Sequence, residues 1–130
     1  MMEGLYVVLV WLMLLFMGLL LPGVSYAQTV EKQKPPMLFM PTAFTPYGDN
    51  LNDLYVIYAH GIQRVAFSVY DRYHTQHYVF EGPPDRLAWD GNNANGYHCP
   101  EGVYVYIIRA YPTDDSLEPI DRSGTITLVR

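Results

Sequence analysis

Beyond residue 36 the chain consists of short stretches in which two kinds of side chain alternate from one position to the next. The clearest is Gly102–Tyr111, in which Val103, Val105 and Ile107 alternate with Tyr104, Tyr106 and Ile108. A period of two residues places successive side chains on opposite faces of a β-strand. Arg64–Tyr70 and Thr125–Val129 alternate in the same way, and no segment after residue 28 keeps an apolar period of 3.6 residues. The pattern therefore predicts strands and argues against a helical domain.

Two further stretches, Leu54–Ala59 and Tyr78–Phe80, are short apolar runs rich in β-branched and aromatic residues, which also favour strands. Residues that tolerate tight turns separate the stretches, at positions 48–50, 60–61, 82–85, 90–93 and 100–102. About seven short strands at this spacing are typical of a sandwich or barrel. We predict an all-β domain, an immunoglobulin-like antiparallel β-sandwich. Cys99 is the only cysteine, so core packing and not an internal disulfide must hold the domain together.

The N-terminus differs from the rest of the chain. Leu5–Leu21 is a continuous apolar run that Pro22 and Gly23 end, and Ser25-Tyr26-Ala27 follows with small residues at the two positions that a signal peptidase reads. We predict a helical signal peptide over residues 1–27, a linker and lead-in over 28–40, and the β-sandwich over 41–130. An uncleaved membrane anchor is the alternative, because the run is at the short end of the roughly 17–25 residues that a spanning helix needs. In both interpretations the rest of the chain is exported.

Charge and motif content narrow the classes of function. The net charge is −5 and Lys and Arg are not clustered, which argues against a nucleic-acid partner. The sequence contains no G-x-S-x-G nucleophile elbow and no Gly-rich phosphate loop. The paired carboxylates Asp114-Asp115 lie in a polar loop, where burial cannot tune them for acid–base catalysis. We therefore predict a protein that is not an enzyme and has no small-molecule substrate.

Five sequence blocks follow one another in a recognisable order. Pro41–Asp53 reads PTAFTPYGDNLND, Val69–Tyr73 reads VYDRY, Trp89–Gly91 reads WDG, Gly102–Tyr106 reads GVYVY, and Gly124–Arg130 reads GTITLVR. With these blocks the chain resembles the gliding-motility-associated C-terminal domain, the type B sorting domain of the type IX secretion system of Bacteroidetes-type bacteria. Tyr47 and Asn50 stand where this family usually has Asn and Gly, and Tyr73 stands where it has Trp.

The resemblance implies recognition by the type IX secretion machinery. The chain would cross the inner membrane by the general route, pass through the periplasm, and then reach the cell surface or the medium. A docking partner of the PorP/SprF-like outer-membrane type is implied. The alternative is a small periplasmic or cell-surface module that binds a protein or a glycan with the same sandwich.

Candidate contact residues lie in the opening loop, on a tyrosine face of the strand at 102–111, and in the C-terminal strand. They are Tyr47, Asp49, Asn52, Asp53, Tyr104, Tyr106, Thr127 and Arg130. The chain has twelve tyrosines, and an exposed tyrosine face suits a binding surface because tyrosine combines a large ring with a hydroxyl. Cross-strand packing of these rings is the alternative. A C-terminal strand at a sheet edge would also allow a partner to add a strand.

A second set of motif residues is expected to be structural: Phe44, Pro46, Gly48, Arg72, Trp89, Asp90, Gly91 and Gly102. Trp89 is expected to anchor a strand end in the core, and Asp90-Gly91 to begin a turn. The side chains of Asp49, Asn52 and Asp53 supply oxygen ligands of the kind that Ca²⁺ prefers. Turn hydrogen bonds to nearby backbone N–H groups are the alternative role for these oxygens. No other cofactor is predicted.

Overall fold

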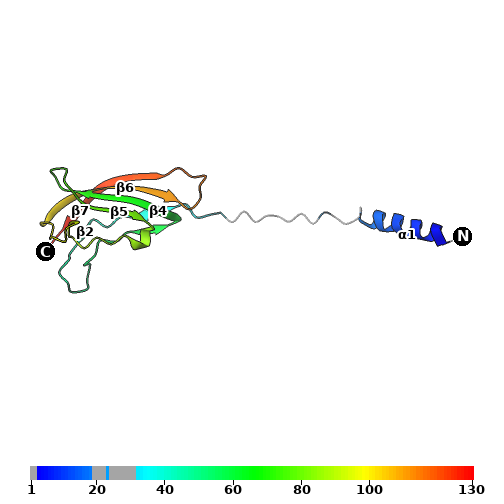
Figure 1. Cartoon of the computed structure of the whole chain (residues 1–130), viewed down its shortest axis with the longest axis horizontal. Coiled ribbons are helices and arrows are strands. Elements are labelled where there is room, and N and C mark those ends of the chain that lie inside the picture. Colours follow the sequence, from blue (N-terminus) through cyan, green and yellow to red (C-terminus); the bar gives the residue numbers. More distant parts are fainter. Residues whose placement is uncertain (1–2, 19–22, 24–31) are drawn as a thin grey trace. The chain divides into compact units, whose positions relative to one another are not determined.

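The computed structural model describes residues 3–18, 23 and 32–130 (Figure 1). The chain divides into two compact units, Met1–Lys32 and Gln33–Arg130. The first unit contains helix α1, Glu3–Gly18, which agrees with the expected N-terminal helix. Among the described residues no helix is both long and apolar enough to cross a membrane. The predicted cleavage site after Ala27 lies outside the described residues.

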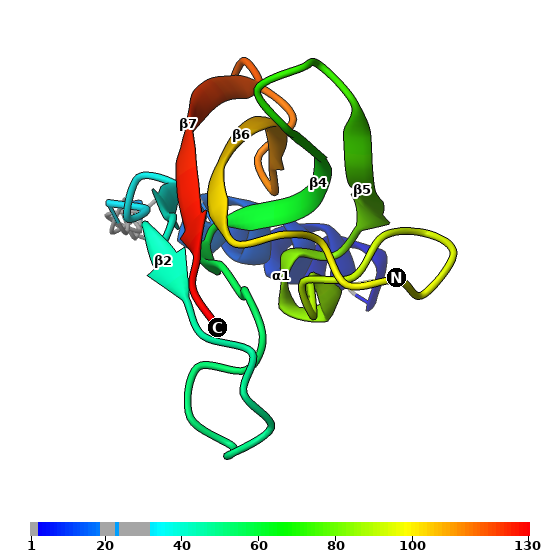
Figure 2. The same ribbon diagram turned by 90° about the vertical axis from the view of Figure 1, so that its left-hand side faces the viewer.

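The second unit is an all-β sandwich of seven strands, as predicted. The strands are β1 (Met37–Phe39), β2 (Ala43–Phe44), β3 (Tyr58–His60), β4 (Ile62–Tyr70), β5 (Gln76–Gly82), β6 (Gly102–Pro112) and β7 (Ile120–Leu128). A short 3-10 helix, η1, covers Pro84–Arg86. One sheet has five strands in the order β2-β7-β6-β4-β5, and β1 and β3 form a separate pair. Figure 2 shows β7, β6, β4 and β5 curving side by side in that order.

Three local features differ from the sequence analysis. Strand β1 lies in the stretch assigned to the lead-in, where Leu38 pairs with Ala59 and is buried. The apolar run Leu54–Ala59 is not one strand, because Tyr55 makes an isolated bridge to Trp89 and only the end of the run enters β3. Strand β7 begins at Ile120, well before the alternation that marks it in the sequence. Tyr55 exchanges two backbone hydrogen bonds with Trp89 and not with a neighbouring strand, so an apolar run alone does not define a strand.

The core lies between the five-stranded sheet and the segments that cover it. Aromatic rings join the two layers: the rings of Tyr55 and Phe67 stack at 6.0 Å, and those of Trp89 and Tyr104 meet at 5.5 Å. Tyr55 and Trp89 are fully buried, and Cys99 is buried beside them in the same core. Packing of large rings therefore takes the place that disulfides fill in many small exported domains.

The alternation predicted for β6 is present, but the expected exposed tyrosine face is wrong. Tyr104 and Tyr106 are only 4 % and 8 % exposed, whereas Val103 and Ile107 are 58 % and 54 % exposed. The tyrosine rings fill the space between the layers, where Tyr106 stacks on Phe67 at 6.0 Å. Both faces of this strand are apolar, so the alternation by itself does not show which face is buried. Cross-strand packing is the role that these tyrosines have.

The end of the C-terminal strand is not a free sheet edge, which corrects the expectation of strand addition at its last residues. The backbone N–H of Thr127 donates to the Thr42 carbonyl oxygen at 2.8 Å, and that of Val129 donates to the Phe44 carbonyl oxygen at 3.2 Å. These bonds accompany the parallel pairing of β2 with β7, in a sheet whose other pairs are antiparallel. The edges of the five-stranded sheet are β2 and β5. The last residues of β7 are thus paired on both sides.

Candidate functional site

The five sequence blocks converge at one end of the sandwich, which we call the motif end. Trp89 forms its centre: its ring lies 5.2 Å from the Phe44 ring and 5.5 Å from the Tyr104 ring. The Tyr104 hydroxyl donates to the Pro100 carbonyl oxygen at 2.6 Å. Burial raises the pKa of Tyr104 to about 12. Three blocks that are far apart in the sequence thus share one aromatic cluster.

Gly91 ties the first, third and last blocks together. Its φ of 80° is in the left-handed region that glycine adopts without strain. A Cβ at this position would lie 3.0 Å from Arg130 Nη2, 3.1 Å from Leu128 Cδ1 and 3.2 Å from Pro46 Cγ. Gly91 therefore lets three neighbours approach its backbone closely. Sequence reasoning assigned Gly91 to a turn but had no signal for this contact.

Arg130 reaches back into the motif end. Its Nη2 donates to the Gly91 carbonyl oxygen at 3.0 Å, and its backbone N–H donates to Glu101 Oε1 at 2.6 Å. Its Nε is buried and has no hydrogen-bond partner in the described part of the chain. Gly102, the residue after Glu101, begins β6 opposite Leu128. Arg130 is thus half-buried and makes hydrogen bonds within the domain. A contact between Arg130 and a partner protein stays a prediction.

The Trp89-Asp90-Gly91 block makes a turn held by its own side chains. Trp89 Nε1 donates to the Asn92 carbonyl oxygen at 2.9 Å, and Asp90 Oδ1 accepts the Asn92 N–H at 2.9 Å. Trp89 is completely buried, whereas Asp90 is exposed. The indole is thereby fixed beneath a surface turn at the motif end.

The opening loop is held in shape by carboxylates. Asp53 accepts the N–H groups of Gly48 and Asn50 at 2.8 and 2.7 Å, and Asp49 Oδ1 accepts the Leu51 N–H at 3.0 Å. Partial desolvation acts to raise the pKa of Asp53, but these N–H groups hold it below its usual value. Asn52 adopts a φ of 54°, which asparagine tolerates better than most residues. These are the hydrogen bonds of a turn.

Metal binding by this loop stays a prediction. In the described part of the chain, no three His, Cys, Asp or Glu side chains are grouped so that they could hold a metal ion. The candidate calcium set of Asp49, Asn52 and Asp53 includes an amide, and two of its members already bond backbone N–H groups. Tyr47 next to this set is 57 % exposed. What the loop presents to solvent is a rigid turn with an exposed ring.

A second turn at the motif end was not singled out as a contact region in the sequence analysis. Asp71 Oδ1 accepts the N–H groups of Tyr73 and Thr75 at 2.8 and 3.0 Å, and Asp71 Oδ2 lies 2.8 Å from His77 Nε2. The hydrogen bond from His77 is the main reason that the pKa of Asp71 is lowered. The Arg72 guanidinium lies over the Tyr73 ring at 5.0 Å. Arg72, expected to be structural, is thus exposed.

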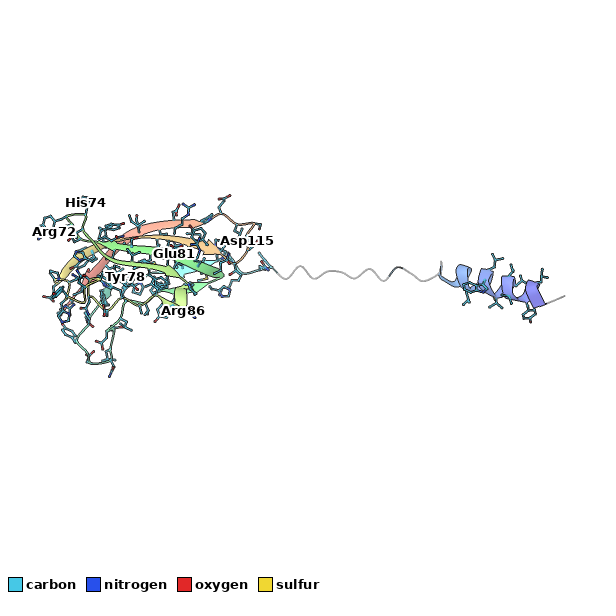
Figure 3. All side chains as sticks on the ribbon, viewed as in Figure 1. Arg72, His74, Tyr78, Glu81, Arg86 and Asp115 are labelled. Atoms are coloured by element: carbon cyan, nitrogen blue, oxygen red, sulfur yellow. The ribbon has the colours of Figure 1, made fainter. Side chains whose placement is uncertain are left out.

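Figure 3 shows where this second turn lies in the sandwich. Arg72 and His74 are at one end, and Asp115 in the β6–β7 loop is at the other. Gly61 lies near that other end, because its carbonyl oxygen accepts the N–H of Thr113 at 2.9 Å, and the Pro36 Cα is 3.3 Å from the position of a Gly61 Cβ. The chain therefore enters the domain away from the motif end.

Comparison with families of known proteins identifies the family of this chain. Residues 38–128 match the family described as CHU_C Type IX secretion signal domain, and this match covers more than half of the chain. The chain belongs to this family. The resemblance inferred from the five blocks is confirmed. No curated protein matches the chain.

Membership defines the general role of the chain. A type IX secretion signal domain directs export through that secretion system and is not an enzyme family. The match begins at Leu38 in β1 and ends at Leu128 in β7, so it covers all seven strands in whole or in part. The region that matches the family is therefore the whole folded sandwich and not a short linear segment.

Proposed function

We propose that the motif end is the face of this signal domain that the type IX secretion machinery reads. The observation that carries the proposal is that five separate sequence blocks meet at one end of the sandwich, three of them in the aromatic cluster of Trp89, beneath exposed turns. A stable core would need only apolar residues of suitable size. Blocks of defined sequence that also build surface turns are better explained by recognition than by folding alone.

The two turns have the properties of a recognition surface. Tyr47 and Leu51 of the opening loop are 57 % and 67 % exposed, and Tyr73 of the second turn is 73 % exposed. Hydrogen bonds to Asp53 and Asp71 hold both turns in one conformation, which reduces the entropy lost on binding. Tyrosine and arginine are the residues that most often dominate the energy of protein interfaces. Recognition would rest on surface complementarity and not on chemistry.

In this proposal the domain folds in the periplasm and docks on an outer-membrane protein of the PorP/SprF-like type. It then passes to the cell surface or the medium. The segment that begins the sandwich passes Gly61, at the end opposite the motif end.

An export assay tests the proposal. A fluorescent protein is inserted between residues 27 and 33 of the full chain, in a bacterium that has type IX secretion. We expect fluorescence at the cell surface or in the medium, and retention in the periplasm when the secretion channel is deleted. Periplasmic retention of the unmodified fusion in the intact strain would refute the proposed function.

A matched set of tyrosine variants locates the recognised face. The double variant Tyr47→Ser, Tyr73→Ser should keep the cargo in the periplasm, because it removes the exposed rings of both turns. Tyr58→Ser is the control, since Tyr58 is 64 % exposed but lies on β3, outside the motif end. Equal export of the double variant and the control would show that the machinery reads another face.

A further inference from the structure

A groove of about 480 Å³ lies at the motif end, between the second turn and the start of β6. Tyr104 and His77 line it, and the His77 ring stands edge-on to the Tyr104 ring at 5.6 Å. Val103 and Val105 also line it and are 58 % and 40 % exposed. These valines continue into the exposed apolar face of β6. The groove thus offers apolar contact area that nothing in the described part of the chain covers.

The charged groups around this groove differ in whether they have a partner within the domain. Asp71 Oδ2 lies at hydrogen-bond distance, 2.8 Å, from His77 Nε2, and Glu101 Oε1 accepts the backbone N–H of Arg130 at 2.6 Å. Arg72 has no ion pair in the described part of the chain, and its guanidinium rests on the Tyr73 ring. The groove therefore has two carboxylates that accept hydrogen bonds within the domain, and an arginine that has no ion pair in the described part of the chain.

Arg72 is also presented in a fixed place. The turn that carries it is closed by hydrogen bonds from the N–H groups of Tyr73 and Thr75 to the Asp71 carboxylate. A guanidinium is planar and suits bidentate contact with a carboxylate. The Arg72 guanidinium lies 5.0 Å from the Tyr73 ring centroid, and no ion pair engages it in the described residues.

From these contacts we infer that the groove binds an extended segment of a partner protein in which a carboxylate lies beside apolar side chains. The carboxylate pairs with Arg72, and the apolar side chains lie against Val103, Val105 and the Tyr73 ring. The inference rests on the proposed function, since the partner is a component of the export machinery. It adds the chemistry by which that partner is recognised.

A peptide array tests the chemistry without the secretion machinery. The protein is purified from the periplasm of cells that express the full chain. It is then applied to ten-residue peptides that have a Leu-Val-Phe centre flanked by Glu, Gln or Lys. We expect on the order of tenfold stronger binding to Glu-flanked than to Lys-flanked peptides, the effect of one charge-assisted contact. Arg72→Glu should reverse this preference, and Val103→Ser should weaken binding to every peptide.

Two control variants separate the charge of Arg72 from effects of misfolding and of net charge. Arg72→Gln should abolish the charge preference without reversing it, and its thermal unfolding should match that of the unmodified chain. Arg86→Glu makes the same charge change on η1, outside the groove, and should leave the preference intact. Equal binding of the Glu and Lys peptides by the unmodified chain would overturn the inference, as would an unchanged preference in Arg72→Glu.

The export assay separates this inference from the proposed function. If the unmodified fusion is exported but the array shows no charge preference, the groove inference fails and the sorting function stands. If the array shows the preference but the fusion is not exported, the groove binds acidic and apolar segments for another purpose, and the link to the export machinery fails. Loss of export in Arg72→Glu together with the reversed preference supports both.

Discussion

At the scale of single residues, Gly91 has the most demanding surroundings at the motif end. Its backbone conformation and its three close neighbours both disfavour a side chain, for different reasons. Gly96 separates the two effects, because it has nearly the same φ, 81° against 80°, and no atom within 4 Å of a Cβ. A comparison of the two glycines therefore measures packing apart from backbone strain.

We expect Gly91→Ala to cost more stability than Gly96→Ala. Both substitutions force a left-handed conformation on alanine, which costs about 1 kcal/mol. Gly91→Ala also presses on Arg130, Leu128 and Pro46, which adds about 1–3 kcal/mol of overpacking. Urea unfolding measures both free energies. Equal losses would mean that the neighbours of Gly91 move aside freely and that the three blocks are not tightly joined there.

At the scale of elements, β6 shows that a strand with two apolar faces is oriented by its surroundings. Its inner face packs on Trp89 and Phe67 through Tyr104 and Tyr106. Its outer face leaves Val103, Val105 and Ile107 in contact with solvent. The groove begins at the same outer face, so the element that completes the core also supplies apolar area for docking.

Ile107 and Ile108 provide a matched test of this orientation. Ile108 is completely buried and Ile107 is 54 % exposed, although they are chemically identical neighbours. Ile108→Ala should lower the free energy of unfolding by about 3 kcal/mol, because it leaves a cavity in the core. Ile107→Ala should change it by less than about 1 kcal/mol. Denaturant titrations that gave the opposite order would mean that the faces of β6 are reversed.

At the scale of the whole molecule, stability depends on aromatic rings that are buried with their hydroxyl groups. The Tyr55 hydroxyl donates to the Pro41 carbonyl oxygen at 2.9 Å, and the Tyr104 hydroxyl donates to that of Pro100. Burial raises the pKa of Tyr55 as well as that of Tyr104, because a phenolate inside the core would lose its hydration. Folding therefore favours the protonated form of these two tyrosine hydroxyl groups.

The domain should accordingly lose stability in alkali. The pKa of Tyr104 is about 12 when folded, against 10.0 for an ordinary tyrosine, so the unfolded chain releases this proton first. Stability is complete below pH 10 and falls between pH 10 and 12, by about 2 kcal/mol for this group alone. Urea unfolding at pH 8 to 11.5 measures the slope.

Tyr104→Phe is the control for the alkaline effect. It should cost about 1 kcal/mol at pH 8, because the hydrogen bond to Pro100 is lost. It should also reduce the decline above pH 10, since one buried hydroxyl no longer ionises. An identical decline in the variant and the unmodified chain would assign the alkaline effect to other groups.

The sequence by itself determined the class of fold, the approximate strands and the family. These follow from local patterns: a period of two residues, turn residues between strands, and five blocks in order. The same patterns located the opening loop and Gly91 as features of interest. The Arg72–Tyr73 pair lies within one of the blocks, yet nothing in the sequence marks it as exposed or as part of a groove.

Only the tertiary structure decided which face of β6 is buried, that β2 pairs with β7, and that Arg130 reaches Gly91. Burial of the tyrosines depends on which rings lie near them: Trp89 in the layer that covers the sheet contacts Tyr104, and Phe67 on the neighbouring strand β4 contacts Tyr106. The pairing of Phe44 with Leu128 and the contact of Arg130 with Gly91 join residues far apart along the chain. Local patterns carry no information about such contacts, because packing of the complete core brings these residues together.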